Sequence, residues 1–248
     1  MRFKWRYLRL VLLLLTLAML YGFAKQRHAK KPLQSINISY SDSYGYFVTE
    51  EAVNKLLIQK NVHLDSVYIE SLDLKMVESS LEENPMIKSA EVSLSIDQRM
   101  SVVVHQRKPI ARVMSPEQYY IDDEAKAMPL STHFTARVPL VYEMDTTLMH
   151  DMAGIIQRVA ADEVLANLLS DVTLEHKNKL RWTSRDQGVE VLMLMDDSIE
   201  DVFNRLKVFY AYAKNKNIWN KYTELDLSYK TQVVGRLKSF ENGQKNNG

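Results

Sequence analysis

A regular alternation of apolar and polar residues near the C-terminal end is the clearest strand pattern in the chain. In the segment LDLSYKTQVVGR (225–236), apolar side chains recur on one side, at Leu225, Leu227, Tyr229 and Val233. A period of two residues is typical of a half-buried β-strand. No further strand pattern follows, so we expect this strand to be the last of its sheet, with an open edge. Such an edge must either be protected against pairing with other chains or serve as a binding site.

At the other end of the chain the pattern is a charge-free apolar run over residues 10–24. Counting from Tyr7, with Arg9 extending toward the surface, gives about 18 residues, or about 27 Å of helix, close to the thickness of a bilayer core. The run therefore predicts a transmembrane helix over residues 8–24. The flanking segments are then a short cytoplasmic head (1–7) and a juxtamembrane linker (25–32).

A cleaved signal peptide is the competing interpretation of this run, with Gly22, Phe23 and Ala24 as a small-x-small cleavage site. The length of the run and the charge of Lys25 directly after it favour an uncleaved signal anchor. Basic residues are equally numerous on both sides, so the positive-inside count does not decide the orientation. Because a short head is more easily left in the cytoplasm than a folded domain, we expect the body to be periplasmic, with one span in the inner membrane.

Between residues 33 and 107 the pattern changes from strand to helix and back to strand. The expected elements are a strand at 33–40, a helix from Thr49 to about Gln59, a helix from about Asp73 to Asn84, and strands at 87–96 and 100–106. Alternation in 87–96 places Ala90, Val92, Leu94 and Ile96 inside. The order is β-α-α-β-β, and a three-stranded sheet carrying two helices can bury one face, so we expect a small domain here.

From residue 108 to 236 short strand patterns alternate with a few helical ones. Strands are expected at 110–114, 118–122, 126–130, 138–142, 171–176, 179–184, 188–195 and 225–236, and helices at 148–159, 163–169 and from 197 or 198 to about 214. We therefore predict a mixed β domain with helices and a C-terminal edge strand, followed by a polar tail (237–248). The fold class of the whole chain is α+β.

The charge and the lack of cysteine exclude several classes of function. The net charge of +1 offers no electrostatic footprint for nucleic acid. The chain has no cysteine, which rules out disulfides, thiolate catalysis and zinc-thiolate sites.

No constellation of polar residues in the sequence indicates catalysis. Acidic pairs such as Glu50-Glu51 and Asp122-Asp123 fit helix first turns, solvated faces and turns. The six histidines lack metal-ligand spacing, and the seven glycines do not form a phosphate-binding loop. We therefore expect no enzymatic activity, no catalytic residue, no cofactor and no metal.

The segment NPMIKSAEVSLSIDQRMSVVVHQRKPIARV (84–113) resembles the bacterial FtsQ/DivIB cell division family, where that family's POTRA domain joins its β domain. The places of the family pattern are filled by Pro85, Ile87, Ala90, Val92, Pro109 and Ala111. YYIDDEAKAMPL (119–130) resembles the strand, turn and strand that follow in that family, and LDLSYK (225–230) resembles its closing strand. The sequence departs from the family pattern at Gln106, Val113 and Arg236, the last of which stands where some members have tryptophan.

The resemblance implies a bitopic inner-membrane scaffold of the divisome, enriched at the division septum, with a POTRA domain at 33–107 and a β domain at 108–236. It implies that the FtsB and FtsL pair binds the extracytoplasmic part, and that FtsB adds a strand to the terminal strand, where Tyr229 corresponds to a tyrosine important for this contact. It also makes the POTRA domain a candidate docking site for other divisome membrane proteins. The partner-binding residues expected from it are Leu227, Ser228, Tyr229, Lys230, Gln232, Val233, Gly235 and Arg236.

Two other classes of protein compete with this interpretation. One is another POTRA-containing periplasmic protein-binding or assembly factor, which usually carries several POTRA units. The other is a periplasmic hydrolase on a membrane tether, which the missing catalytic constellation disfavours. Depletion would separate them, because filamentous cells indicate the division scaffold and outer-membrane defects indicate the assembly factor.

Overall fold

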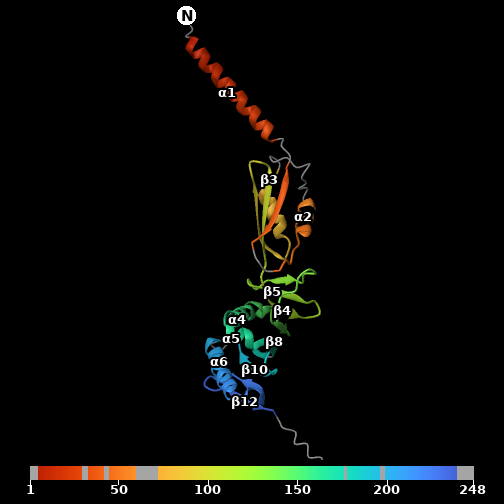
Figure 1. Cartoon of the computed structure of the whole chain (residues 1–248), viewed down its shortest axis with the longest axis vertical. Helices are drawn as coiled ribbons and strands as arrows, with labels where there is room; N and C mark the ends of the chain where they lie inside the picture. Colours follow the sequence, from red (N-terminus) through yellow and green to blue (C-terminus); the bar gives the residue numbers. More distant parts are fainter. Residues whose placement is uncertain are drawn as a thin grey trace, which may run out of the picture. The chain divides into compact units, whose positions relative to one another are not determined.

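The structure, a computed structural model, describes residues 5–29, 33–41, 45–59, 72–175, 178–195 and 199–238 (Figure 1). The chain forms two compact units, Met1–Gln106 and Arg107–Gly248. Outside the described residues lie parts of the expected head (1–4), linker (30–32) and polar tail (239–248). Independent folding of 33–107 and 108–236 stays a prediction.

Helix α1 spans Trp5–Ala29. The predicted transmembrane helix over residues 8–24 is wrong, since none of the helices in the described ranges combines the length and apolarity needed to cross a membrane. The physical reason is the charge that bounds the apolar run. Within α1 the charge-free run covers only residues 10–24. This run is about 22 Å of helix, whereas a hydrocarbon core is about 30 Å thick. The longer count had included Arg9, so the expected single-pass placement in the inner membrane has no support from α1.

The first unit contains a three-stranded sheet in the order β1-β3-β2. Strand β1 (Ser35–Tyr40) runs parallel to β3 (Arg99–Gln106), and β2 (Ile87–Leu94) is antiparallel to β3. Helices α2 (Glu50–Gln59) and α3 (Leu74–Glu82) lie between β1 and β2 in the sequence. The elements thus follow the order β-α-α-β-β that the sequence pattern indicated.

Both helices of this unit begin at a polar side chain and contribute apolar residues to one core. The Thr49 hydroxyl accepts a hydrogen bond from the Ala52 amide at 3.3 Å, and the Asp73 carboxylate accepts one from the Met76 amide at 3.2 Å. The buried cluster includes Val53, Leu57, Val77, Leu81, Val92, Met100, Val102 and Val104. Ile96 was expected inside, but it lies in the turn after β2 and is exposed.

The second unit contains a nine-stranded sheet in the order β12-β11-β10-β9-β8-β7-β4-β5-β6. Its strands are β4 (Pro109–Met114), β5 (Tyr119–Asp122), β6 (Ala127–Pro129), β7 (Leu140–Tyr142), β8 (Leu169–Glu175), β9 (Lys179–Ser184), β10 (Glu190–Leu194), β11 (Tyr222–Asp226) and β12 (Val234–Leu237). The pairs β4·β7, β7·β8 and β10·β11 are parallel and the others are antiparallel. Mixed sheets with separate helices give the α+β class.

Helices supply the other layer of the second unit's core. They are the short η2 (Thr146–Leu148) and η3 (Trp219–Lys221) and the α-helices α4 (Met149–Ala161), α5 (Glu163–Leu168) and α6 (Ile199–Asn215). Their buried apolar residues, among them Met152, Ile156, Leu165, Val202 and Leu206, pack with Val172, Trp182, Val191 and Leu225 of the strands. The opposite face carries charged side chains such as Arg181 of β9, Glu190 of β10 and Glu224 of β11.

The C-terminal part of this sheet differs from the sequence prediction. The predicted single strand over 225–236 is wrong, because the chain leaves the sheet after Asp226 and returns at Val234. The result is two short antiparallel strands, β11 and β12, joined by a loop. Strand β12, in blue at the C-terminal end of the described chain in Figure 1, is the outermost strand at this side of the sheet.

Candidate functional site

The site is the C-terminal end of the nine-stranded sheet, formed by β11, the connecting loop and β12. Strand β11 ends because the Asp226 carboxylate accepts a hydrogen bond from the Ser228 amide at 2.9 Å, a side-chain turn that competes with strand pairing. The Leu227 amide still donates to the Leu192 carbonyl of β10 at 2.8 Å, and the Leu227 side chain is fully buried. The chain therefore turns away from the sheet at Ser228.

Arg205 of α6 holds the loop in place. Its guanidinium donates hydrogen bonds to three backbone carbonyls, those of Leu227 at 3.2 Å, of Gln232 at 3.2 Å, and of Tyr229. A guanidinium presents several donors in a fixed plane, which suits a set of converging carbonyls. One side chain thus fixes the start, the tip and the end of the loop, and with them the position from which β12 begins.

Close packing against Gly235 brings β12 onto β11. A Cβ atom at Gly235 would lie 2.5 Å from Cε1 of Tyr222 and 3.4 Å from Cδ2 of Leu225, so a side chain there would collide with the Tyr222 ring. That ring is itself held in an edge-to-face contact with Phe209 of α6, with centroids 5.4 Å apart. Gly235 therefore allows the aromatic ring of one strand to lie across the backbone of the next.

The outer side of β12 carries its own backbone hydrogen-bonding groups. The Lys238 amide donates to the Lys221 carbonyl at 2.8 Å, so it points inward toward the β11 side. Because amides alternate in direction along a strand, those of Leu237 and Gly235 point outward. No other strand in the described ranges pairs with this side, and all four residues of β12 are exposed.

A groove of about 570 Å³ lies beside the loop, between α6 and the segment before β12. It is lined by Asn204, Arg205, Val208, Phe209, Tyr212, Thr231, Gln232 and Val233. Val208 and Tyr212 lie one helical turn apart on α6 and are 72% and 55% exposed. Tyr229, at the tip of the loop, is 51% exposed. The end of the sheet thus combines a backbone edge with apolar surface next to it.

A row of charged side chains crosses the polar face of the sheet toward this edge. Arg181 of β9 contacts three carboxylates, those of Glu175 at 2.6 Å, of Glu224 at 3.2 Å, and of Glu190. The hydrogen bond with Glu175 is the largest of the effects that raise the pKa of Arg181 above its ordinary value. Glu224 of β11 also pairs with Arg236 of β12 at 3.5 Å. The row therefore links β8 to β12 and ends in a cation at the last strand.

The eight residues predicted as partner-binding do not lie on one strand. Only Gly235 and Arg236 belong to β12, whereas the other six lie in the connecting loop: Leu227, Ser228, Tyr229, Lys230, Gln232 and Val233. The sequence prediction left out Val234 and Leu237, which complete the exposed strand. It also left out Arg205, which lies about 20 residues before the loop and could be found only from the three-dimensional contact.

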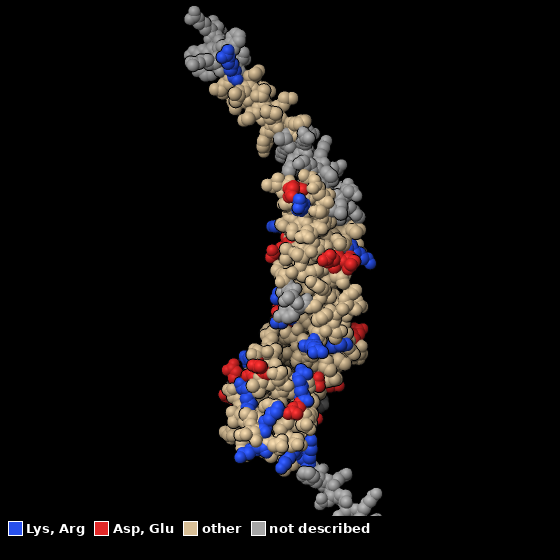
Figure 2. Space-filling model, in the orientation of Figure 1, with Lys and Arg blue, Asp and Glu red and all other residues tan. Residues whose placement is uncertain are grey.

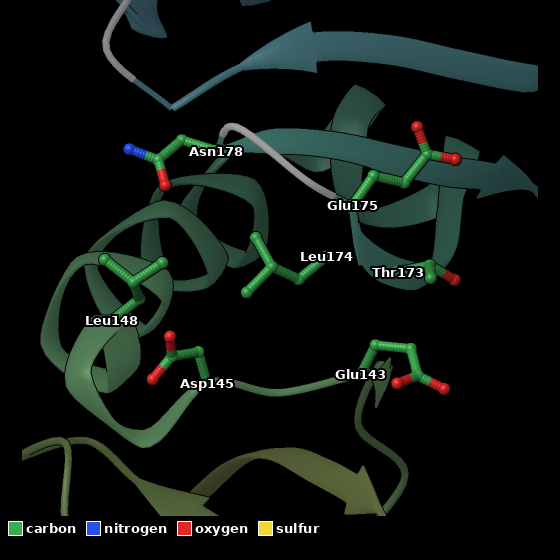
Figure 3. A pocket seen from close by; sticks show the side chains of 7 residues that line it. All are labelled: Glu143, Asp145, Leu148, Thr173, Leu174, Glu175 and Asn178. Carbon is green, nitrogen blue, oxygen red and sulfur yellow. The ribbon is translucent and has the colours of Figure 1, made fainter.

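A second hollow in this unit, of about 690 Å³, has acidic walls (Figure 3). Its lining residues are Glu143, Asp145, Leu148, Thr173, Leu174, Glu175 and Asn178. Glu175 is bound to Arg181, Asp145 accepts from the Thr147 amide at 2.9 Å, and the carboxylates of Glu143 and Glu175 do not point toward one another. In the part of the chain that the structure describes, no cluster of potential metal ligands occurs.

Comparison with models of known protein families gives a match over the second unit. Residues 108–236 match the family described as FtsQ/DivIB, C-terminal related, and this segment covers more than half of the chain. No curated protein matches the chain. The matched segment begins just before β4 and ends within β12, so it contains the whole nine-stranded sheet except for Leu237, the last residue of β12.

Proposed function

The chain belongs to the FtsQ/DivIB family, a family of non-catalytic cell division scaffolds, and from that premise we propose that it holds partner proteins at the division septum through β12. In this proposal the FtsB and FtsL pair is the partner, and FtsB adds a strand to the outer side of β12. Main-chain hydrogen bonds then supply affinity, and alternate side chains supply register.

The observation that carries the proposal is the position of β12, the end strand of the sheet, with the amides of Gly235 and Leu237 directed outward. An added strand would satisfy these groups and extend the sheet. The exposed ring of Tyr229 and the groove along α6 lie next to this edge and offer apolar surface for side chains of the same partner.

Of the other three end strands in the described sheets, β2 and β6 are closed, which favours β12 over these two as the docking strand. In the first unit, Glu82 and Glu78 of α3 accept hydrogen bonds from the amides of Ala90 at 3.2 Å and Val92 at 2.8 Å. These amides point away from β3, so two carboxylates occupy the free edge of β2. In the second unit, β6 has three residues and ends at Pro129, which has no N–H to donate.

We further propose that the first unit is a POTRA domain that docks other division proteins. Its order β-α-α-β-β and its single core support this assignment. We place its boundary with the β domain at residues 107 and 108, and expect limited proteolysis to yield the two fragments separately.

The proposed docking is tested with a proline on the outward side of β12. Ser228 and Lys230 lie in the loop, where a proline would not act on the edge, whereas Leu237→Pro removes an outward amide of β12 and leaves the inward hydrogen bonds. Binding of the purified full chain to the FtsB and FtsL pair of the same organism is measured by calorimetry. We expect Leu237→Pro to weaken binding by at least about 10-fold, a change of about 1.4 kcal/mol.

Leu237→Ala is the matched control, because it removes the same side chain and retains the amide. It should bind more tightly than the proline variant. If the folded proline variant binds the pair with unchanged affinity, β12 only closes the sheet and the docking site lies elsewhere.

A further inference from the structure

Arg236 is the only charged side chain on β12, and the structure leaves it exposed. Its side chain is 73% exposed, whereas that of its cross-strand partner Glu224 is only 15% exposed. Glu224 is shared, since it also pairs with Arg181 of β9 at 3.2 Å. A guanidinium has five N–H donors, so one shared carboxylate at 3.5 Å leaves Arg236 with capacity for a second acidic partner.

The charge pattern of the sheet face continues up to Arg236 and stops there. From β8 to β12 the side chains of the row are Glu175, Arg181, Glu190, Glu224 and Arg236, in which Arg181 contacts the carboxylates on β8, β10 and β11 and Arg236 contacts that of Glu224 on β11. Opposite charges on adjacent strands stabilise a sheet and like charges destabilise it. A side chain that an added strand places in this row would therefore lie next to the positive charge of Arg236.

The chain segment that contains β12 and the preceding loop has the same sign. Residues 227–238 contain Lys230, Arg236 and Lys238 and no acidic residue. Figure 2 shows basic side chains gathered at the end of the second unit where β12 lies in Figure 1. A basic strand would be repelled here, and an acidic one attracted.

Adding a strand also changes the solvation of Arg236. A neighbour on the outer side of β12 would cover part of a side chain that is now mostly in water. A charge that loses water must gain a partner, or the loss disfavours binding. A carboxylate on the same face of the added strand meets this need, and its planar geometry matches the guanidinium.

We propose that Arg236 selects the incoming strand, by pairing with an aspartate or glutamate that the partner places beside it on the polar face of the extended sheet. The inference rests on the proposed strand addition at β12.

The test is a double-mutant cycle between Arg236→Gln and neutralised acids of the partner. Binding of the full chain to the FtsB and FtsL pair is measured for a series of FtsB variants. In each variant one Asp or Glu of the FtsB segment that pairs with β12 is changed to Asn or Gln. We expect Arg236→Gln to weaken binding on the order of 10-fold against the unchanged pair. Arg236→Gln should cause no further loss of affinity when the FtsB acid that pairs with Arg236 has already been neutralised. Arg158→Gln on the exposed face of α4 is the control and should bind normally.

The cycle separates pairing from a purely structural role of Arg236. If Arg236 only held β12 through Glu224, its replacement would weaken binding equally for every form of the partner, which would overturn the inference. Normal binding by Arg236→Gln, together with lost binding by Leu237→Pro, would overturn the inference and leave the proposed function standing. Normal binding by both variants would overturn both.

Discussion

Arg205 of α6 donates a hydrogen bond to the backbone carbonyl of Tyr229, so a helix holds the tip of the loop that leads into the last strand. The same guanidinium reaches the carbonyls of Leu227 and Gln232. The position of the edge strand is therefore set by a helical side chain as well as by pairing with β11.

Replacing Arg205 by methionine should loosen the loop. Three carbonyls lose a charged donor, and we expect the free energy of unfolding to fall by about 1.5–3 kcal/mol, the range for hydrogen bonds to charged groups. Denaturant unfolding measures the change. Arg158→Met on α4 is the matched control and should stay within about 0.5 kcal/mol of the parent. Equal stabilities of the two variants would show that the hydrogen bonds of Arg205 contribute nothing to the stability of the fold.

Alanine at Gly235 should destabilise the β11–β12 pair, because its Cβ would collide with the Tyr222 ring. The expected loss is roughly 1–3 kcal/mol, as for other overpacked sites. Gly154→Ala on α4 is the opposite case, since nothing lies within 4 Å of the added Cβ, and it should gain about 0.5–1 kcal/mol from helix propensity. Thermal unfolding of both variants checks the signs of the two stability changes. A Gly235→Ala variant as stable as the parent would contradict the close packing of Gly235 against Tyr222.

The carboxylates on the free edge of β2 should protect the amides that they accept from. We expect the double variant Glu78→Ala and Glu82→Ala to speed hydrogen exchange at Ala90 and Val92 and to make the protein self-associate, since the edge is then bare. The double glutamine variant retains the side-chain carbonyl and should keep the protection. Unchanged exchange in the alanine variant would show that the carboxylates do not close this edge.

Asp162 should make stability depend on pH at the junction of α4 and α5. The hydrogen bond from Lys207, at 2.6 Å, holds the pKa of Asp162 below its ordinary value of 3.8 in the folded chain. Its contribution to stability is thus complete above about pH 3.8 and is lost as the pH falls through the lowered folded-state pKa. In Asp162→Asn, which keeps the cap of α5, this part of the pH dependence should vanish. A stability difference between parent and variant that stays constant down to acid pH would contradict it.

Much of the fold could be predicted from hydrophobic periodicity, because most elements have a single buried face. The helix α4, expected at 148–159, spans Met149–Ala161, and the strand expected at 179–184 is β9 (Lys179–Ser184). The carboxylate of Asp122 accepts from the amides of Glu124 and Lys126, as expected for a turn.

The failures of the sequence analysis at the two ends of the chain have different physical causes. At the N-terminus, counting past Arg9 made a run look long enough for a membrane when its charge-free part is shorter. At the C-terminus, alternation continued through a loop that contains neither glycine nor proline, so neither of the two strongest turn residues marked the turn at Ser228. The turn depends on Asp226 and on Arg205, and the second of these contacts joins segments that are distant in the sequence.

The central claim is that a partner strand pairs with the outer side of β12, and amide hydrogen exchange at Gly235 and Leu237 tests it most directly. The full chain is compared alone and saturated with the FtsB and FtsL pair. If the strand is added, both outward amides become hydrogen-bonded, and their exchange should slow by at least about 10-fold. The inward amide of Lys238, already bonded to Lys221, should change much less. Unchanged exchange at both Gly235 and Leu237 in the saturated complex would contradict the claim.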